Sequence, residues 1–137
     1  MKWPVIALCA IIAGIQLIQV QRTNPEVVYD FDGPSEVKAL LKRSCYDCHS
    51  NETEWPWYSH VAPASWLVDH HVEDGRKHLN FSEWEALRVM GWIRNEIVEE
   101  VAGGKMPPKS YLRMHSDAKV TAEELAILQE WAGAQGP

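Results

Sequence analysis

Uncharged, mostly apolar residues fill positions 3–20 of the chain. The run extends from Trp3 to Val20, with Lys2 before it and Arg22 after it. An α-helix over such a run would be about 27 Å long, close to the thickness of the hydrocarbon core of a bilayer. The pattern therefore predicts a transmembrane anchor over residues 1–20.

A cleaved signal peptide and a lipoprotein signal are the alternatives to this anchor. The end of the run, Ile15 to Val20, offers no small-residue cleavage site. A lipoprotein would be attached at Cys9, but bulky Leu8 precedes it and most of the apolar run follows it. We therefore favour an uncleaved anchor, in which Cys9 is a small apolar residue of the helix.

The spacing of apolar residues changes after the anchor. Residues 21–33 contain Asn24-Pro25 and end at Gly33-Pro34, which are turn and breaker signals. They predict an extended tether. Beyond it, apolar residues recur at helical spacing and strands are not indicated, so we expect an all-α domain over 34–137. The predicted helices are 34–45, 63–78, 82–102 and 121–132.

Two of these helices open with the capping-box pattern, in which a hydroxyl and a carboxylate three residues later satisfy free amide groups. The pairs are Ser82 with Glu85 and Thr121 with Glu124. The pattern predicts that both pairs mark helix N-termini.

Composition narrows the function without deciding it. The 137 residues suit one domain, and the net charge of −6 argues against nucleic acid as a partner and favours a basic or neutral protein. Seven Trp residues could wall a flat cofactor. Trp55, Trp57, Trp66 and Trp131 are the candidates, although core packing is the simpler interpretation of each. Trp131 is expected to pack near Leu41.

The candidate chemistry lies in Cys45-Tyr46-Asp47-Cys48-His49, a C-x-x-C-H motif. This is the attachment signature of haem c. Two thiols three positions apart can reach the two vinyl groups of one porphyrin edge, and the following His is carried to the iron. A thioredoxin-like pair would need a strand–helix setting, and a zinc site would need a second ligand pair. Those sites and a Cys45–Cys48 disulfide are the lesser alternatives.

The iron has a second axial position, for which Met106 is the best candidate. It lies in Gly-Gly-Lys-Met-Pro-Pro, where two glycines allow a close turn and two prolines stiffen the loop. A thioether ligand raises the reduction potential of haem. The alternatives are Met114, His115, His60, or an open sixth position. Met106 as ordinary apolar filler is the structural alternative.

The second predicted helix carries further histidines. His70 and Asp74 are spaced i,i+4, which suits a metal ion, and His71 and His78 are on the same helix. A solvated amphipathic face explains these residues more simply.

Taken together, C-Y-D-C-H, G-K-M-P-P and the closing T-A-E-E-L-A-I-L-Q-E-W resemble a class I c-type cytochrome. More narrowly, R-T-N-P, C-Y-D-C-H-S-N-E-T-E-W-P-W-Y-S, A-P-A-S-W-L-V, G-R-K-H-L-N-F-S-E-W and K-M-P-P-K-S-Y are similar to the membrane-anchored haem-binding-domain family. The resemblance covers nearly the whole chain.

This resemblance implies a cytochrome c-like fold with one covalent haem on Cys45 and Cys48, His49 as proximal ligand and Met106 as distal ligand. A long insertion rich in Trp and His departs from small class I cytochromes. We expect Pro56 or Pro63, both within it, to supply a backbone acceptor for His49.

Three functional hypotheses follow. The first is a single-pass membrane protein with its haem domain on the periplasmic side, which transfers single electrons between redox proteins or a respiratory or photosynthetic membrane complex. It would be an electron carrier and not an enzyme. The second is a haem peroxidase or sensor with an open sixth site. The third is a haem-bearing structural subunit of a larger complex.

Overall fold

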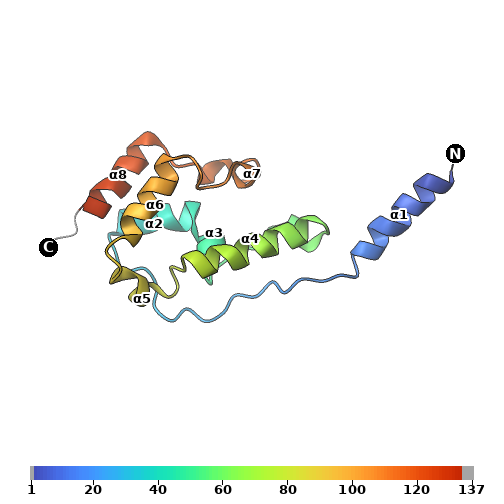
Figure 1. Ribbon diagram of the computed structural model, residues 1–137, viewed down its shortest axis with the longest axis horizontal. Coiled ribbons are helices and arrows are strands. Elements are labelled where there is room, and N and C mark those ends of the chain that lie inside the picture. Colours follow the sequence, from blue (N-terminus) through green and yellow to red (C-terminus); the bar gives the residue numbers. More distant parts are fainter. Residues whose placement is uncertain (1, 134–137) are drawn as a thin grey trace.

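The computed structural model describes residues 2–133, and the regular elements of this part of the chain are all helices, without a strand. The all-α prediction is therefore confirmed. Helix α1 (Trp3–Ile15) stands apart from the others at one end of the molecule (Figure 1). The remaining elements are α2 (Ser35–Ser44), α3 (Tyr46–His49), η1 (Trp57–His60), α4 (Ala64–His78), α5 (Trp84–Arg88), α6 (Ile93–Ala102), α7 (Lys109–Leu112), η2 (Ser116–Ala118) and α8 (Ala122–Gly133).

The predicted membrane anchor is wrong. Within residues 2–133, every helix is too short or too polar to cross a membrane. Helix α1 has 13 residues and ends at Ile15, with Gln16 as its C-cap. Its length is about 20 Å, against roughly 30 Å for the hydrocarbon core of a bilayer. The side-chain amide of Gln16 instead bonds both the N–H and the carbonyl of Ala62, at 3.0 and 3.1 Å. The expectation of a single-pass membrane protein is overturned with it.

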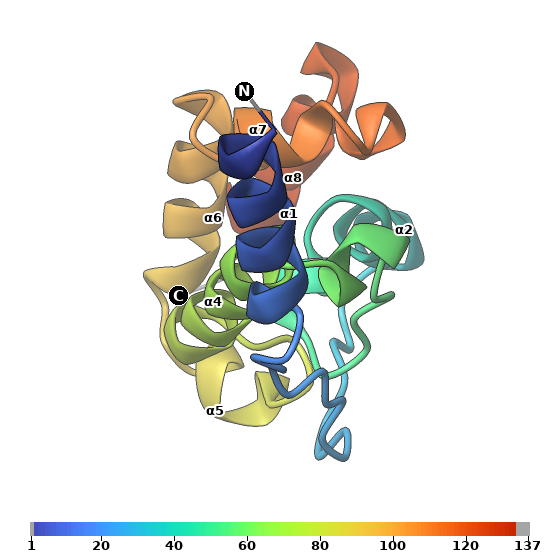
Figure 2. The same ribbon diagram turned by 90° about the vertical axis from the view of Figure 1, so that its right-hand side faces the viewer.

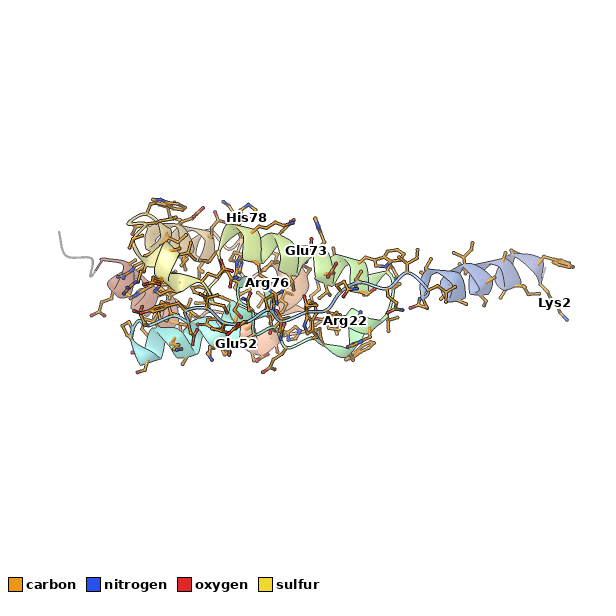
Figure 3. The ribbon with its side chains drawn as sticks, turned by 90° about the horizontal axis from the view of Figure 1, so that it is seen from below. Lys2, Arg22, Glu52, Glu73, Arg76 and His78 are labelled. Carbon is orange, nitrogen blue, oxygen red and sulfur yellow. The ribbon has the colours of Figure 1, made fainter. Side chains whose placement is uncertain are left out.

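Residues 21–33 are extended, and they lie along the helical domain (Figures 1 and 2). Arg76 of α4 holds this segment by donating to the Thr23 carbonyl at 3.0 Å and the Asn24 amide oxygen at 3.1 Å (Figure 3). The same guanidinium donates to the Ser50 carbonyl at 2.7 Å and the Thr53 hydroxyl at 2.9 Å. One arginine thus ties the segment to the residues that follow His49.

The core is formed mainly by large aromatic rings. Phe31, which is 1% exposed, lies against Trp84 and Trp131, with ring centroids 5.0 and 5.5 Å apart. The ring of Tyr46 stacks on Phe81 at 5.2 Å. Trp131 and Leu41 belong to the same buried cluster, which confirms that Trp131 packs near Leu41. The same cluster contains aliphatic residues of α2, α6 and α8, so the core joins α2, α3, α5, α6 and α8.

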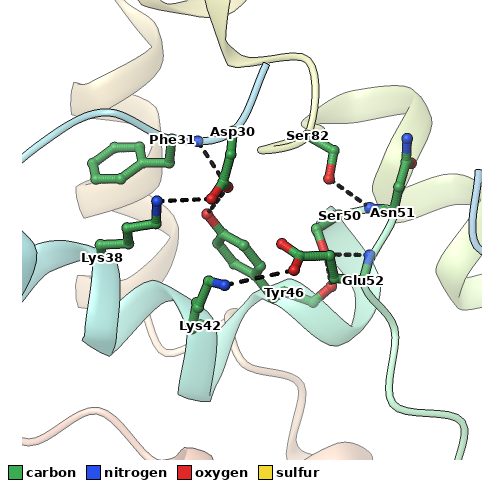
Figure 4. A network of polar contacts seen from close by, with 9 residues as sticks. All are labelled: Asp30, Phe31, Lys38, Lys42, Tyr46, Ser50, Asn51, Glu52 and Ser82. Atoms are coloured by element: carbon green, nitrogen blue, oxygen red, sulfur yellow. Dashed lines mark hydrogen bonds and ion pairs between the residues drawn. The ribbon is translucent and has the colours of Figure 1, made fainter. Parts of the chain in front are cut away.

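A polar network borders this core (Figure 4). The Tyr46 hydroxyl donates to Asp30 at 2.8 Å, and Lys38 forms an ion pair with the same carboxylate at 2.7 Å. Nearby, the N–H of Asn51 donates to the Ser82 hydroxyl at 2.8 Å. The two contacts of Asp30 fix the extended segment against α2 and the motif that contains Tyr46.

The predicted helices 34–45, 63–78 and 121–132 are confirmed by α2, α4 and α8. At the start of α8, Thr121 and Glu124 form the predicted capping box, with bonds of 2.9 and 3.2 Å. The third predicted helix is instead two helices, α5 and α6, separated by a turn over residues 89–92. The Ser82 capping box is wrong, because the hydroxyl of Ser82 accepts from Asn51 and α5 begins later, at Trp84.

Candidate haem site

Cys45 and Cys48 lie at the junction of two helices. Cys45 ends α2 and precedes the single turn of α3, whose N–H groups at Cys48 and His49 donate to the Cys45 carbonyl at 3.2 and 2.9 Å. Both thiols are free and partly buried. Burial raises the pKa of Cys45 to about 12 and that of Cys48 to about 11. The pair is therefore protonated near neutral pH, unlike the low-pKa thiolates of thiol–disulfide enzymes.

The imidazole of His49 is held at one of its two nitrogens. Its Nδ1 lies 2.9 Å from the carbonyl oxygen of Gly75 and 3.1 Å from that of Leu79. Carbonyl oxygens only accept, so Nδ1 carries the proton and Nε2 of the neutral ring keeps its lone pair. Burial lowers the pKa of His49, which favours this neutral form. The ring is thus prepared to bind a metal through Nε2.

These two acceptors correct a prediction. Pro56 and Pro63 were expected to supply the backbone acceptor, but it comes from the end of α4. The carbonyl of Gly75 also accepts the N–H of Leu79 at 2.9 Å, so one oxygen serves both the helix and His49.

Gly75 has a second role at this contact. A Cβ at this position would lie 2.3 Å from the backbone oxygen of Cys48 and 3.2 Å from its Cβ. Helix α4 therefore packs directly against the second cysteine, at a distance that only glycine permits. A glycine inside a long helical pattern is a signal that could have identified this residue from the sequence.

Asp47, between the two cysteines, is bonded on both carboxylate oxygens. One accepts the backbone N–H of Glu54 at 3.0 Å, and the other accepts the hydroxyl of Tyr111 at 2.6 Å. The ring of Tyr111 stacks on His115, with centroids 4.3 Å apart, and Nε2 of His115 lies 2.8 Å from the Tyr58 hydroxyl. Nothing in the sequence spacing indicated that α7 would reach the motif.

Met106 lies on the loop between α6 and α7. Its N–H donates to the Glu100 carbonyl at 3.1 Å, and the loop turns at Gly104, whose φ of 67° suits glycine. The side chain of Met106 is 37% exposed, whereas Pro107 is buried. The thioether is therefore partly accessible, next to a loop residue that is packed.

The alternative axial ligands lie in other parts of the fold. Met114 is 57% exposed, and His60 is exposed at the end of η1. His115 has its Nε2 engaged by Tyr58. On α4, His70 pairs with Asp74 at 3.1 Å, and His71 and His78 are exposed as well. Residues 2–133 contain no group of three or more His, Cys, Asp or Glu that could hold a metal ion.

The tryptophans considered as cofactor walls have other contacts. The indole N–H of Trp55 donates to Asn24 at 3.1 Å, and that of Trp66 donates to the Ile18 carbonyl at 3.2 Å. Trp131 lies in the core, and Trp57 is largely exposed. Trp55 and Trp66 therefore anchor the segment that follows α1.

Residues 10–134 match the model of a haem-binding domain family. The chain belongs to this haem-binding domain family. It is also 30% identical, over 104 residues, to a cytochrome c peroxidase, Ccp, of Escherichia coli (strain K12). That match covers 70% of this chain and 22% of the peroxidase, so the chain corresponds to less than a quarter of its relative. No solved structure matches the chain.

The donor set of the site fits the cofactor of this family. One protonated thiol, that of Cys45, precedes the single turn of α3, the other, that of Cys48, lies within it, and the next residue is an imidazole with a free Nε2. Thioether formation requires thiols, and iron ligation requires a neutral imidazole. The residues of the C-x-x-C-H motif therefore provide the types of group that a covalently bound haem needs.

Proposed function

We propose that this haem-binding domain is a c-type cytochrome that carries single electrons between redox proteins. Cys45 and Cys48 would hold one haem through thioether bonds, His49 would ligate its iron through Nε2, and Met106 would be the second axial ligand. The bound haem would supply the one-electron redox chemistry. The observation that carries the proposal is the fixed orientation of His49, whose Nδ1 is bonded to the carbonyls of Gly75 and Leu79.

The protein's own contribution is to orient and protect these ligands. The two carbonyls at the end of α4 fix the tautomer of His49 and make its free nitrogen a stronger donor. The contact of Gly75 with Cys48 keeps that helix close to the motif. A second ligand from Met106 would leave no iron position open to substrates, which favours electron transfer over catalysis.

Covalent attachment is tested by expressing the chain in a host that performs c-type haem maturation. Haem should remain on the wild-type protein in a denaturing gel, and the variant with Cys45→Ala and Cys48→Ala should lose it. Retention of haem by this double variant, or its absence from the wild-type protein, would contradict the proposal.

The axial ligands are tested by spectroscopy of the purified protein. The ferric wild-type protein should show the near-infrared methionine-to-iron band, and Met106→Ala should abolish it, whereas Met114→Ala should leave it unchanged. An identical spectrum for Met106→Ala would assign the sixth position to another group.

A peroxide-reducing haem site is a second candidate, favoured by the similarity to the Escherichia coli peroxidase and by the partial exposure of Met106. It requires an open or weakly held sixth position. Rapid binding of carbon monoxide to the ferrous protein, together with consumption of peroxide by the pre-reduced protein, would favour the peroxide-reducing site over the electron carrier.

A further inference from the structure

Three segments that are distant in the sequence meet beside the C-x-x-C-H motif. Asp47 comes from α3, Tyr58 from η1, and Tyr111 and His115 come from α7 and the turn after it. They form a continuous series of contacts: Tyr58 to His115 at 2.8 Å, His115 stacked on Tyr111, and Tyr111 to Asp47 at 2.6 Å. The link between Tyr111 and Asp47 is the one that reaches the motif.

Tyr111 is fixed from both ends. Its hydroxyl meets a carboxylate whose other oxygen is already bonded to the Glu54 N–H at 3.0 Å. Its ring lies parallel to that of His115, with an interplanar angle of 9°. Burial and the hydrogen bond to Asp47 both raise the pKa of Tyr111, so the phenol stays protonated and donates. The bond is charge-assisted, which is among the stronger kinds of side-chain hydrogen bond.

The restraint on Tyr111 extends back along the chain to Met106. Helix α7 has only four residues and begins at Lys109, and the N–H of Leu112 donates to the Pro108 carbonyl at 3.1 Å. Pro107 is buried, and the N–H of Met106 is bonded to Glu100 at the end of α6. The loop that bears Met106 is therefore held at α6 on one side and at Asp47 on the other.

We propose that Tyr111 and Asp47 are positioning residues, which hold the loop of Met106 against the haem and so keep the thioether on the iron. This inference rests on the proposed function. The Tyr111→Phe change keeps the ring and its stack on His115, and it removes only the hydroxyl that binds Asp47. It therefore isolates the restraint from the packing.

The test compares Tyr111→Phe and Asp47→Asn with a matched control, Tyr29→Phe. Tyr29 also donates to a carboxylate, Asp32 at 2.9 Å, but it lies on the extended segment before α2. The readouts are the ferric methionine-to-iron band, the reduction potential, and the rate of carbon monoxide binding to the ferrous protein. A hydrogen bond to a charged group shifts an equilibrium by about ten-fold. We expect Tyr111→Phe to bind carbon monoxide about ten-fold faster, with a weaker band and a changed potential.

The two proposals fail in different ways. If the wild-type protein shows the band, and Tyr111→Phe and Asp47→Asn both bind carbon monoxide at the wild-type rate, the positioning role is overturned while Met106 remains the ligand. If the wild-type protein lacks the band and Met106→Ala has the same spectrum, the proposed ligand itself is wrong and so is the positioning role. The Asp47→Asn variant, which keeps the side-chain volume, supplies the same readouts should Tyr111→Phe unfold.

Discussion

The contact between Gly75 and Cys48 gives the sharpest prediction for the stability of the site. In Gly75→Ala, the added Cβ would lie 2.3 Å from the Cys48 carbonyl oxygen and 3.0 Å from its carbonyl carbon. Both are backbone atoms, which cannot rotate away as a side chain would. An ordinary van der Waals separation requires α3 and α4 to part by about 1 Å.

Two opposing effects set the size of the change. Alanine is favoured over glycine inside a helix by about 1 kcal/mol. Overpacking of a tight contact costs about 1–3 kcal/mol, and the clash with backbone places this site at the upper end. Parting the helices also stretches the 2.9 Å bond between His49 and Gly75 beyond hydrogen-bond length. We therefore expect a net loss of about 2 kcal/mol, which lowers Tm by roughly 6–10 °C.

Thermal and urea unfolding followed by circular dichroism measures this loss. Gly14→Ala is the matched control, because Gly14 also lies in a helix but its added Cβ would meet nothing within 4 Å. It should leave Tm unchanged or slightly higher. A Gly75→Ala protein as stable as this control, with wild-type haem content, would refute the close-packing argument.

Three further predictions concern other parts of the fold. Thr121→Ala removes the capping box of α8 and should cost about 1 kcal/mol in urea unfolding, while Thr121→Ser should not. Burial alone would raise the pKa of Asp30, but hydrogen bonds from Lys38 and Tyr46 outweigh it and hold the pKa below its ordinary 3.8. Stability from this group is present above pH 3.8 and is lost as the pH falls below it, so the unfolding free energy of Asp30→Asn should fall less steeply there. Arg76→Met should cost about 2 kcal/mol and speed proteolysis within residues 21–31, whereas equal proteolysis rates would contradict the role of this arginine.

Local sequence patterns predicted hydrogen bonds correctly where the two bonded residues are near each other in the sequence. The Thr121 capping box formed because both of its members belong to the same turn. The Ser82 box has the same spacing, but its hydroxyl accepts from Asn51, thirty-one residues away. A local sequence pattern gives no information about a bonding partner so far along the chain. The same limit explains the wrong acceptor that was predicted for His49. Proximity along the chain favoured Pro56 and Pro63, whereas the fold places the carbonyl of Gly75 beside the imidazole.

The apolar N-terminal run shows a different limit of prediction from sequence, which concerns the length of a helix. Hydropathy predicted one helix of membrane-spanning length, but the amide of Gln16 bonds Ala62 and the helix ends at Ile15. At the motif, the residues that bear the chemistry were evident from spacing alone. Spacing did not show that Gly75 accepts from His49 or that Tyr111 donates to Asp47, because both contacts depend on how distant segments pack.

The hold of Arg76 on the extended segment has a mechanical consequence. Its guanidinium joins Thr23 to Ser50, the residue next to His49, and Phe31 closes the far end of the segment in the core. A load applied at α1 would pass first to Ala62 and Trp66, through Gln16 and Ile18, and then through Arg76 to the backbone beside the candidate iron ligand. Through these hydrogen bonds, the extended segment couples the position of α1 to that of the C-x-x-C-H motif.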